Sequence, residues 1–141
     1  MSEVCADVVE LKLLPDAKYI AVVRLAAAAV ASRAGMTVDD VDDLKVAVSE
    51  VFTNVIDHAF EGRELRPVVI RMTPRPTGLA VEIIDEGVGF DVGSRDFNAE
   101  ADLSQEGGLG LYLVHRYMDE VSIESAPGSG TKVTMLKRLA R

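Results

Sequence analysis

The segment Glu50-Val51-Phe52-Thr53-Asn54 places a carboxylate and an amide four residues apart. On a helix, residues at that spacing lie on the same side, so Glu50 and Asn54 would present their side chains together. The amide oxygen of Asn54 is a hard donor of the kind that Mg²⁺ prefers. The Glu50 carboxylate could act as a general base, or position a nucleophile, beside a phosphoryl group. Taken alone, the pair also fits an exposed helix face with ordinary polar residues.

A second segment, Asp85-Glu86-Gly87-Val88-Gly89, directly follows an apolar run over residues 79–84. A carboxylate at the end of a strand can accept a hydrogen bond from the exocyclic amine of adenine, whereas it would repel the oxygen that guanine presents there. Gly87 and Gly89 permit backbone conformations closed to other residues and let a base approach the main chain closely. In isolation, the same residues also describe a simple turn after a strand.

A third segment, Gly107-Gly108-Leu109-Gly110-Leu111, closes a long polar stretch over residues 88–107 and opens a predicted helix. Successive small residues let backbone N–H groups converge on an anion, and the helix N-terminus adds a favourable dipole. No Gly-Lys-Ser/Thr follows, so the segment is neither a Walker A loop nor a dinucleotide fingerprint. Glycine used simply to hinge a loop is the alternative. Polar stretches of this length within compact domains are usually lids or disordered segments.

Alternating strands and helices are predicted to position these segments. Thr37 with the acidic residues after it is typical of a helix start, and Gly35 can adopt the left-handed conformation that ends the preceding helix. Strands are expected at residues 8–14, 67–73, 79–85, 120–125 and 131–136, and helices at 16–34, 37–60 and 109–118. In the second helix the apolar residues fall on one arc. They are Val41, Leu44, Ala47, Val48, Val51 and Val55.

We therefore expect an α+β two-layer sandwich, with about five strands in a mixed, mainly antiparallel sheet and three main helices on one face. The length of 141 residues suits one domain with one core, spanning residues 1–141.

The net charge of −8 argues against nucleic acid as a partner, because phosphates would be repelled. Cys5 is the single cysteine, which excludes an internal disulfide and favours a reducing compartment. The N-terminus lacks a signal-peptide pattern. The longest apolar stretch, residues 20–31, is interrupted by Arg24 and is shorter than the ~20 residues that span a bilayer. A cytoplasmic protein without a membrane partner is the expectation.

In order and spacing, the three segments together resemble the ATP site of the left-handed-crossover (Bergerat) fold shared by gyrase, Hsp90, histidine kinases and MutL. The resemblance implies ATP and Mg²⁺ as cofactors, with Glu50 as catalytic base and Asn54 as metal ligand. Thr131 matches the last sequence box of that superfamily, where a threonine hydroxyl commonly supports the Asp85 carboxylate or a bridging water. The implied nucleotide-binding residues are Asn54, Asp85, Gly87, Gly89, Gly107, Gly108, Gly110, Leu111 and Thr131.

Within the superfamily, the chain looks most like the small anti-sigma-factor serine kinases of Gram-positive bacteria. The residues that carry this likeness are 30–35, 43–50, 107–113 and 118–121. It implies a homodimer that sequesters a sigma factor and phosphorylates a serine of an antagonist protein, and a lid over residues 88–106. Arg24 occupies the position where the family places a partner-contacting arginine. The alternative for Arg24 is a side chain that simply reaches solvent from an apolar helix.

Two other functions remain open from the residues. One is a nucleotide-gated module that only binds a sigma factor, for which Asn54 and Asp85 would suffice without a base. The other is a detached catalytic domain of a sensor histidine kinase, which the likeness outside the ATP segments disfavours.

Overall fold

The computed structural model describes residues 7–90 and 108–139, with the backbone alone for residues 108–111. Within these ranges, five strands form one sheet in the order β1-β2-β3-β5-β4. Every pairing of neighbouring strands in it is antiparallel, where a mixed sheet was expected. The strands are β1 Val9–Leu13, β2 Val68–Arg75, β3 Gly78–Asp85, β4 Glu120–Ser125 and β5 Thr131–Arg138.

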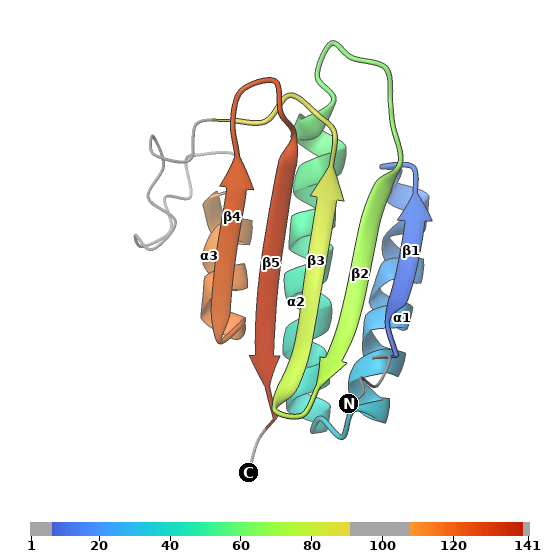
Figure 1. The fold of residues 1–141 in the computed structure, drawn as a ribbon, viewed down its shortest axis with the longest axis vertical. Coiled ribbons are helices and arrows are strands. Elements are labelled where there is room, and N and C mark those ends of the chain that lie inside the picture. The colour runs from blue at the N-terminus through green and yellow to red at the C-terminus, as the bar shows by residue number, and fades with distance from the viewer. Residues whose placement is uncertain (1–6, 91–107, 140–141) are drawn as a thin grey trace, which may run out of the picture.

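The described helices all cover one face of this sheet (Figure 1). A short 3₁₀ turn, η1 (Ala17–Tyr19), leads into α1 (Ile20–Arg33), and α2 covers Val38–Asn54. A π-helical turn, η2 (Val55–Ala59), continues α2, and α3 covers Gly108–Tyr117. The expected two-layer sandwich is therefore confirmed.

The core lies between the sheet and the helices. The predicted apolar arc of α2 is confirmed, since Val41, Leu44, Ala47, Val48, Val51 and Val55 are all buried. The start of α2 is also as expected, because the Thr37 side chain accepts a hydrogen bond of 3.1 Å from the backbone N–H of Asp40. Gly35 follows α1 with a φ of +91°, the left-handed conformation predicted for it.

The second helix differs from its prediction at its end. A single helix was expected to about residue 60, but the α-helical part ends at Asn54 and η2 carries the chain onward. Such π-helical turns are frequent at functional sites. This one carries Ala59 to the turn that follows β3, as described below.

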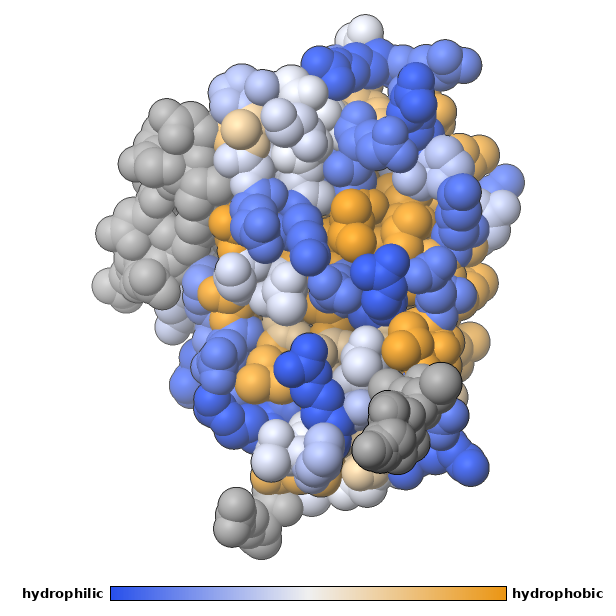
Figure 2. All heavy atoms as spheres, viewed as in Figure 1, coloured by the Kyte–Doolittle hydropathy of each residue, from blue (hydrophilic) through white to orange (hydrophobic). Residues whose placement is uncertain are grey.

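The opposite face of the sheet is open, and Figure 2 shows it as largely hydrophilic with apolar side chains between the charged ones. A chain of ion pairs crosses it from β1 to β5. Arg71 Nε lies 2.9 Å from Glu10 Oε2, Arg71 Nη1 lies 3.3 Å from Glu82 Oε1, and Lys132 Nζ lies 3.0 Å from Glu82 Oε2. The hydrogen bond from Lys132, together with the one from Arg71, lowers the pKa of Glu82.

On the helix side, Lys137 joins three elements at the end of the sheet away from Asp85. Its ammonium group donates a 2.6 Å hydrogen bond to the carbonyl of Tyr117 at the end of α3. The same Nζ lies 3.4 Å from Asp43 Oδ2 and 3.8 Å from Asp40 Oδ1, both in α2. These contacts fix α2 and α3 relative to β5. No described helix is both long and apolar enough to cross a bilayer.

Candidate functional site

The carboxylate of Asp85 is buried at the end of β3, with 5% of the residue exposed. Its Oδ1 accepts a 2.8 Å hydrogen bond from the backbone N–H of Gly87, so the chain turns tightly around it. Burial raises the pKa of Asp85, and backbone hydrogen bonds from Gly87 and Thr131 act in the opposite direction. None of these causes is a cationic side chain. The buried carboxylate is therefore suited to accept a hydrogen bond from a ligand.

The two glycines of this turn are required by close backbone contacts. A Cβ on Gly87 would lie 2.1 Å from the carbonyl oxygen of Ala59. Gly89 has a φ of +64°, and a Cβ there would lie 2.1 Å from the carbonyl oxygen of Ala126. The turn is thus held between the end of η2 and the turn that joins β4 to β5.

Backbone hydrogen bonds hold the turn on both sides. Val88 N–H donates to Ala59 O at 2.6 Å, and Gly128 N–H donates to Val88 O at 2.7 Å. The segment after β3 therefore joins the end of the α2–η2 helix to the β4–β5 hairpin.

Thr131 is the register partner of Asp85 on the neighbouring strand. A hollow of about 380 Å³ lies at this end of the sheet, lined in part by Asp85, Ser125, Gly130 and Thr131. Thr131 thus lies beside Asp85, and its hydroxyl oxygen is 2.8 Å from that of Ser125. Ser125 was not predicted. The signal was present, because the strands that flank the turn 126–130 must pair Ser125 with Thr131.

Glu50 and Asn54 both belong to the last two turns of α2 and are half-buried. The contact between Ala59 and Val88 places this end of the helix at the same end of the molecule as Asp85. Neither side chain lines the hollow beside Asp85. The structure therefore brings Gly87 and Thr131 into contact with Asp85 and places Gly89 in the same turn. Glu50 and Asn54 lie on the helix that adjoins this turn.

The phosphate-binding segment is described only in part. Gly108, Gly110 and Leu111 belong to the first turn of α3, which begins one residue before the predicted start. Gly107 and most of the predicted lid over residues 88–106 lie outside the described residues. The end of α3 packs into the core through Val114 and Met118, so the helix is anchored at the end away from the glycines.

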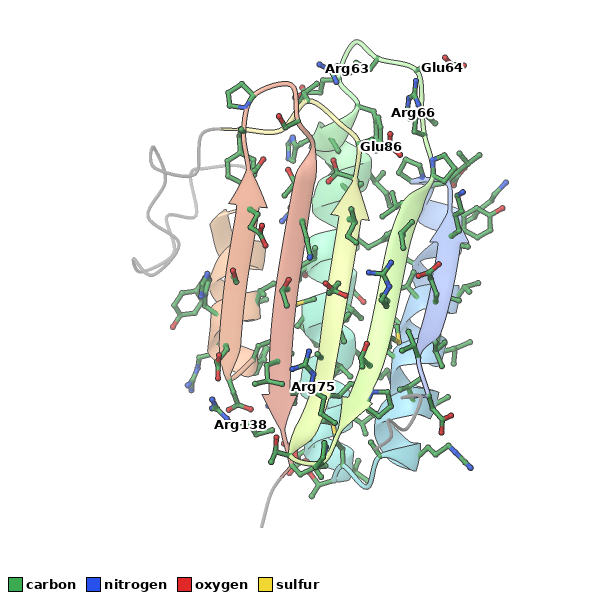
Figure 3. All side chains as sticks on the ribbon, viewed as in Figure 1. Arg63, Glu64, Arg66, Arg75, Glu86 and Arg138 are labelled. Atoms are coloured by element: carbon green, nitrogen blue, oxygen red, sulfur yellow. The ribbon has the colours of Figure 1, made fainter. Side chains whose placement is uncertain are left out.

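Two arginines of the loop 61–67 reach the turn after β3, at the end of the molecule where Figure 3 labels them together with Glu86. Arg63 Nη1 donates a 3.2 Å hydrogen bond to the carbonyl of Gly87. Arg66 lies 3.8 Å from Glu86, and both of these side chains are largely exposed. Sequence reasoning did not single out Arg63, because no local pattern links residue 63 to residue 87.

Arg24 lies exposed on α1. Next to it, Leu25 is 69% exposed and Val22 is 42% exposed. A cation flanked by exposed apolar side chains is typical of a contact surface.

Within the described residues, no cluster of three or more His, Cys, Asp and Glu side chains is placed to hold a metal ion. Mg²⁺ in phosphoryl-transfer sites usually takes one or two protein oxygens together with substrate phosphates. A single amide such as that of Asn54 fits this manner of binding.

The sequence is similar to those of known proteins over most of its length. The model of the histidine kinase-like ATPase domain matches residues 13–137. Serine-protein kinase RsbW of Bacillus velezensis is 39% identical over 140 residues, covering 94% of this chain and 86% of that protein. RsbW of Bacillus subtilis is 39% identical, covering 95% and 87%, and RsbW of Staphylococcus aureus is 35% identical, covering 96% and 89%.

Solved structures agree in fold. The histidine kinase domain from an Erythrobacter litoralis blue-light activated histidine kinase gives a TM-score of 0.58 at 23% identity, covering 86% of this chain and 60% of that one. The RsbU and RsbW domains of Rv1364c from Mycobacterium tuberculosis give a TM-score of 0.69 at 18% identity, covering 95% of this chain and 33% of the longer one.

Proposed function

The chain belongs to the histidine kinase-like ATPase family and, within it, to the serine-protein kinases named RsbW, and on that premise we propose that it is an ATP-dependent protein serine kinase and an anti-sigma factor. The likeness to RsbW at 39% identity over 94% of the chain is the observation that carries the proposal. The proposed unit is one domain over residues 1–141, located in the cytoplasm.

In the proposed site, Asp85 receives the exocyclic amine of adenine at the turn after β3. Gly87 and Gly89 keep the turn that carries Asp85 packed against Ala59 and Ala126, since neither position leaves room for a side chain. The helix N-terminus at Gly108, Gly110 and Leu111, together with Gly107, receives the triphosphate. The adenine end and the phosphate end are then held by different elements.

For the chemistry, Glu50 accepts the proton of the attacking serine hydroxyl as the phosphoryl group is transferred. Mg²⁺ would be held by the amide oxygen of Asn54 and by the phosphates, and it would neutralise charge that develops on them. Glu50 lies one helical turn from Asn54, which supports the assignment of base and ligand to one site.

A nucleotide-gated module without kinase activity is the weaker alternative. The relatives with the same coverage are named serine-protein kinases, and a module that only switched would not need a carboxylate at position 50. A detached sensor kinase domain is disfavoured because the likeness to a histidine kinase domain, at 23% identity, extends to the fold alone.

The proposal is tested with the purified chain, Mg²⁺, ATP labelled at the γ-phosphate and a candidate small antagonist protein that carries a serine acceptor. The expected result is label on one serine of the antagonist. Label on this chain's own histidine residues would support a sensor kinase, and ATP binding without transfer would support the gated module.

The proposed partners are a sigma factor and the antagonist, bound to a homodimer of this chain. Arg24 is the proposed contact, supported by its exposure on α1 beside Leu25 and Val22. An exposed arginine in this setting can pair with an acidic partner residue as the apolar neighbours exclude water.

Replacing Arg24 by alanine is expected to weaken sigma-factor binding by about fivefold or more, since arginine is enriched among the interface residues that contribute more than ~1 kcal/mol. Binding is measured by calorimetry at two salt concentrations, and ATP affinity should not change. Arg33→Ala, in the last turn of the same helix, is the matched control. Equal sigma-factor affinity for the Arg24 variant and the unmodified protein would remove this residue from the interface.

A further inference from the structure

The hydroxyl of Ser125, at the end of β4, makes three contacts that meet beside the proposed adenine site. The backbone N–H of Phe90 donates to Ser125 Oγ at 2.9 Å. Ser125 Oγ lies 2.9 Å from the carbonyl oxygen of Gly130 and 2.8 Å from Thr131 Oγ1. One side chain therefore joins the turn after β3 to Gly130, the last residue before β5, and to Thr131, its first residue.

Only one arrangement of protons makes all three contacts hydrogen bonds. A serine hydroxyl has one proton to donate and two lone pairs that accept. The Phe90 amide can only donate, and the Gly130 carbonyl can only accept. Ser125 must then donate to Gly130, and the remaining contact requires Thr131 to donate its own proton to Ser125.

The Thr131 hydroxyl has therefore already donated its proton to Ser125 and can act only as a hydrogen-bond acceptor toward a ligand. Asp85, its register partner, likewise offers acceptor atoms as a carboxylate. Both residues line the hollow at the end of the sheet, together with Ser125 and Gly130. Asp85 and Thr131 thus present acceptors on two neighbouring strands at this end of the sheet.

Building on the ATP-dependent function proposed above, we propose that Ser125 is a positioning residue that sets purine specificity by holding the proton of the Thr131 hydroxyl away from the base. The exocyclic amine of adenine carries two N–H donors, which match the two acceptors of Asp85 and Thr131. A purine with an oxygen at that position meets acceptors only and is rejected. Without the Ser125 hydroxyl, Thr131 is free to rotate and donate to that oxygen.

The probe is inosine triphosphate, whose base carries an oxygen in place of the adenine amine. Dissociation constants for ATP and inosine triphosphate are measured for the unmodified protein, Ser125→Ala, and Ser125→Thr. The ratio of the two constants should fall about three- to tenfold in Ser125→Ala, the size expected for one hydrogen bond. Ser125→Thr keeps the hydroxyl and should restore the original ratio. Ser122→Ala, on the open side of the same strand, is the matched control and should leave the ratio unchanged.

Coupling through Thr131 is tested by a double-mutant cycle with Thr131→Val. Ser125→Ala should change the ratio in the normal background and leave it nearly unchanged in the Thr131→Val background. Additive effects, or equal losses for both nucleotides, would overturn the inference and leave Ser125 as a structural residue.

Should Ser125→Ala not fold, Ser125→Cys keeps the volume with a weak donor and gives the same comparison. If the unmodified protein binds ATP with preference and the ratio does not respond, this inference alone fails. If the unmodified protein binds neither nucleotide, the proposed function fails.

Discussion

Glu50→Ala should lower the rate of phosphoryl transfer to the antagonist by about 10²- to 10⁴-fold, the contribution typical of a positioned general base. The affinity for Mg²⁺–ATP should stay within a few-fold of that of the unmodified protein. The physical reason is that the carboxylate acts on the proton of the incoming serine, which is absent when ATP binds alone. A loss confined to the catalytic rate is the signature of an interaction made in the transition state.

The measurement is single-turnover transfer with saturating ATP, paired with ATP binding by calorimetry. Asp42→Asn is the charge-matched control, because Asp42 is an exposed carboxylate near the start of the same helix, with its side chain 64% exposed. It should transfer at the normal rate. Normal transfer by Glu50→Ala would exclude Glu50 as the base, and a parallel loss of ATP affinity would assign it to nucleotide binding.

The sequence was sufficient to predict most of the fold, because helix and strand periodicity is a local property. The buried arc of α2 and the Thr37 cap follow from spacing and residue type within a few residues. The same pattern could not show that the helix changes to a π-helical turn after Asn54, since η2 continues the apolar spacing. That change accompanies a hydrogen bond between Ala59 and Val88, which are distant in sequence.

In the candidate site, too, local features could be predicted and contacts between residues distant in sequence could not. Asp85, Gly87 and Gly89 could be predicted to form one turn because they stand in one short segment, and the Gly87 bond to Asp85 is local. The place of Arg63 could not be predicted, because its bond to Gly87 depends on tertiary packing. A mainly antiparallel sheet was predicted, but the strand order β1-β2-β3-β5-β4 was not, since the order depends on how the connections cross.

Asp85→Asn should weaken ATP binding by about 10- to 150-fold, the equivalent of the ~1.5–3 kcal/mol of a hydrogen bond to a charged group. The carboxylate has two oxygens, and Oδ1 already accepts from Gly87 N–H. Asparagine has one oxygen, so satisfying Gly87 turns its NH₂ group toward the adenine amine, where two donors meet. The same NH₂ group could donate to the oxygen of guanine, so the preference for ATP over GTP should decrease.

Loss of folding would not explain this result. Burial raises the pKa of Asp85, which means that its ionised form is disfavoured in the folded protein. A neutral asparagine removes that cost and keeps an acceptor for Gly87, while the backbone hydrogen bond from Thr131 is weakened by the loss of charge. The two effects oppose each other, so the melting temperature should stay close to that of the unmodified protein. Glu82→Gln is the matched control, because Glu82 lies on the same strand with its partners Arg71 and Lys132 on the open face. It should bind ATP normally.

The pH dependence of ATP affinity distinguishes the contribution of the Asp85 carboxylate from that of the other site residues. As the pH falls toward the raised pKa of Asp85, the free protein takes up a proton and loses an acceptor, so the ATP affinity of the unmodified protein should decrease. Protonation of the nucleotide affects every variant alike. Asp85→Asn has no group to titrate at this position. Its ATP affinity should therefore not show the decrease at low pH that protonation of Asp85 causes in the unmodified protein. Parallel pH profiles for the two proteins, or equal ATP affinity at neutral pH, would show that Asp85 does not contact the base in its ionised form.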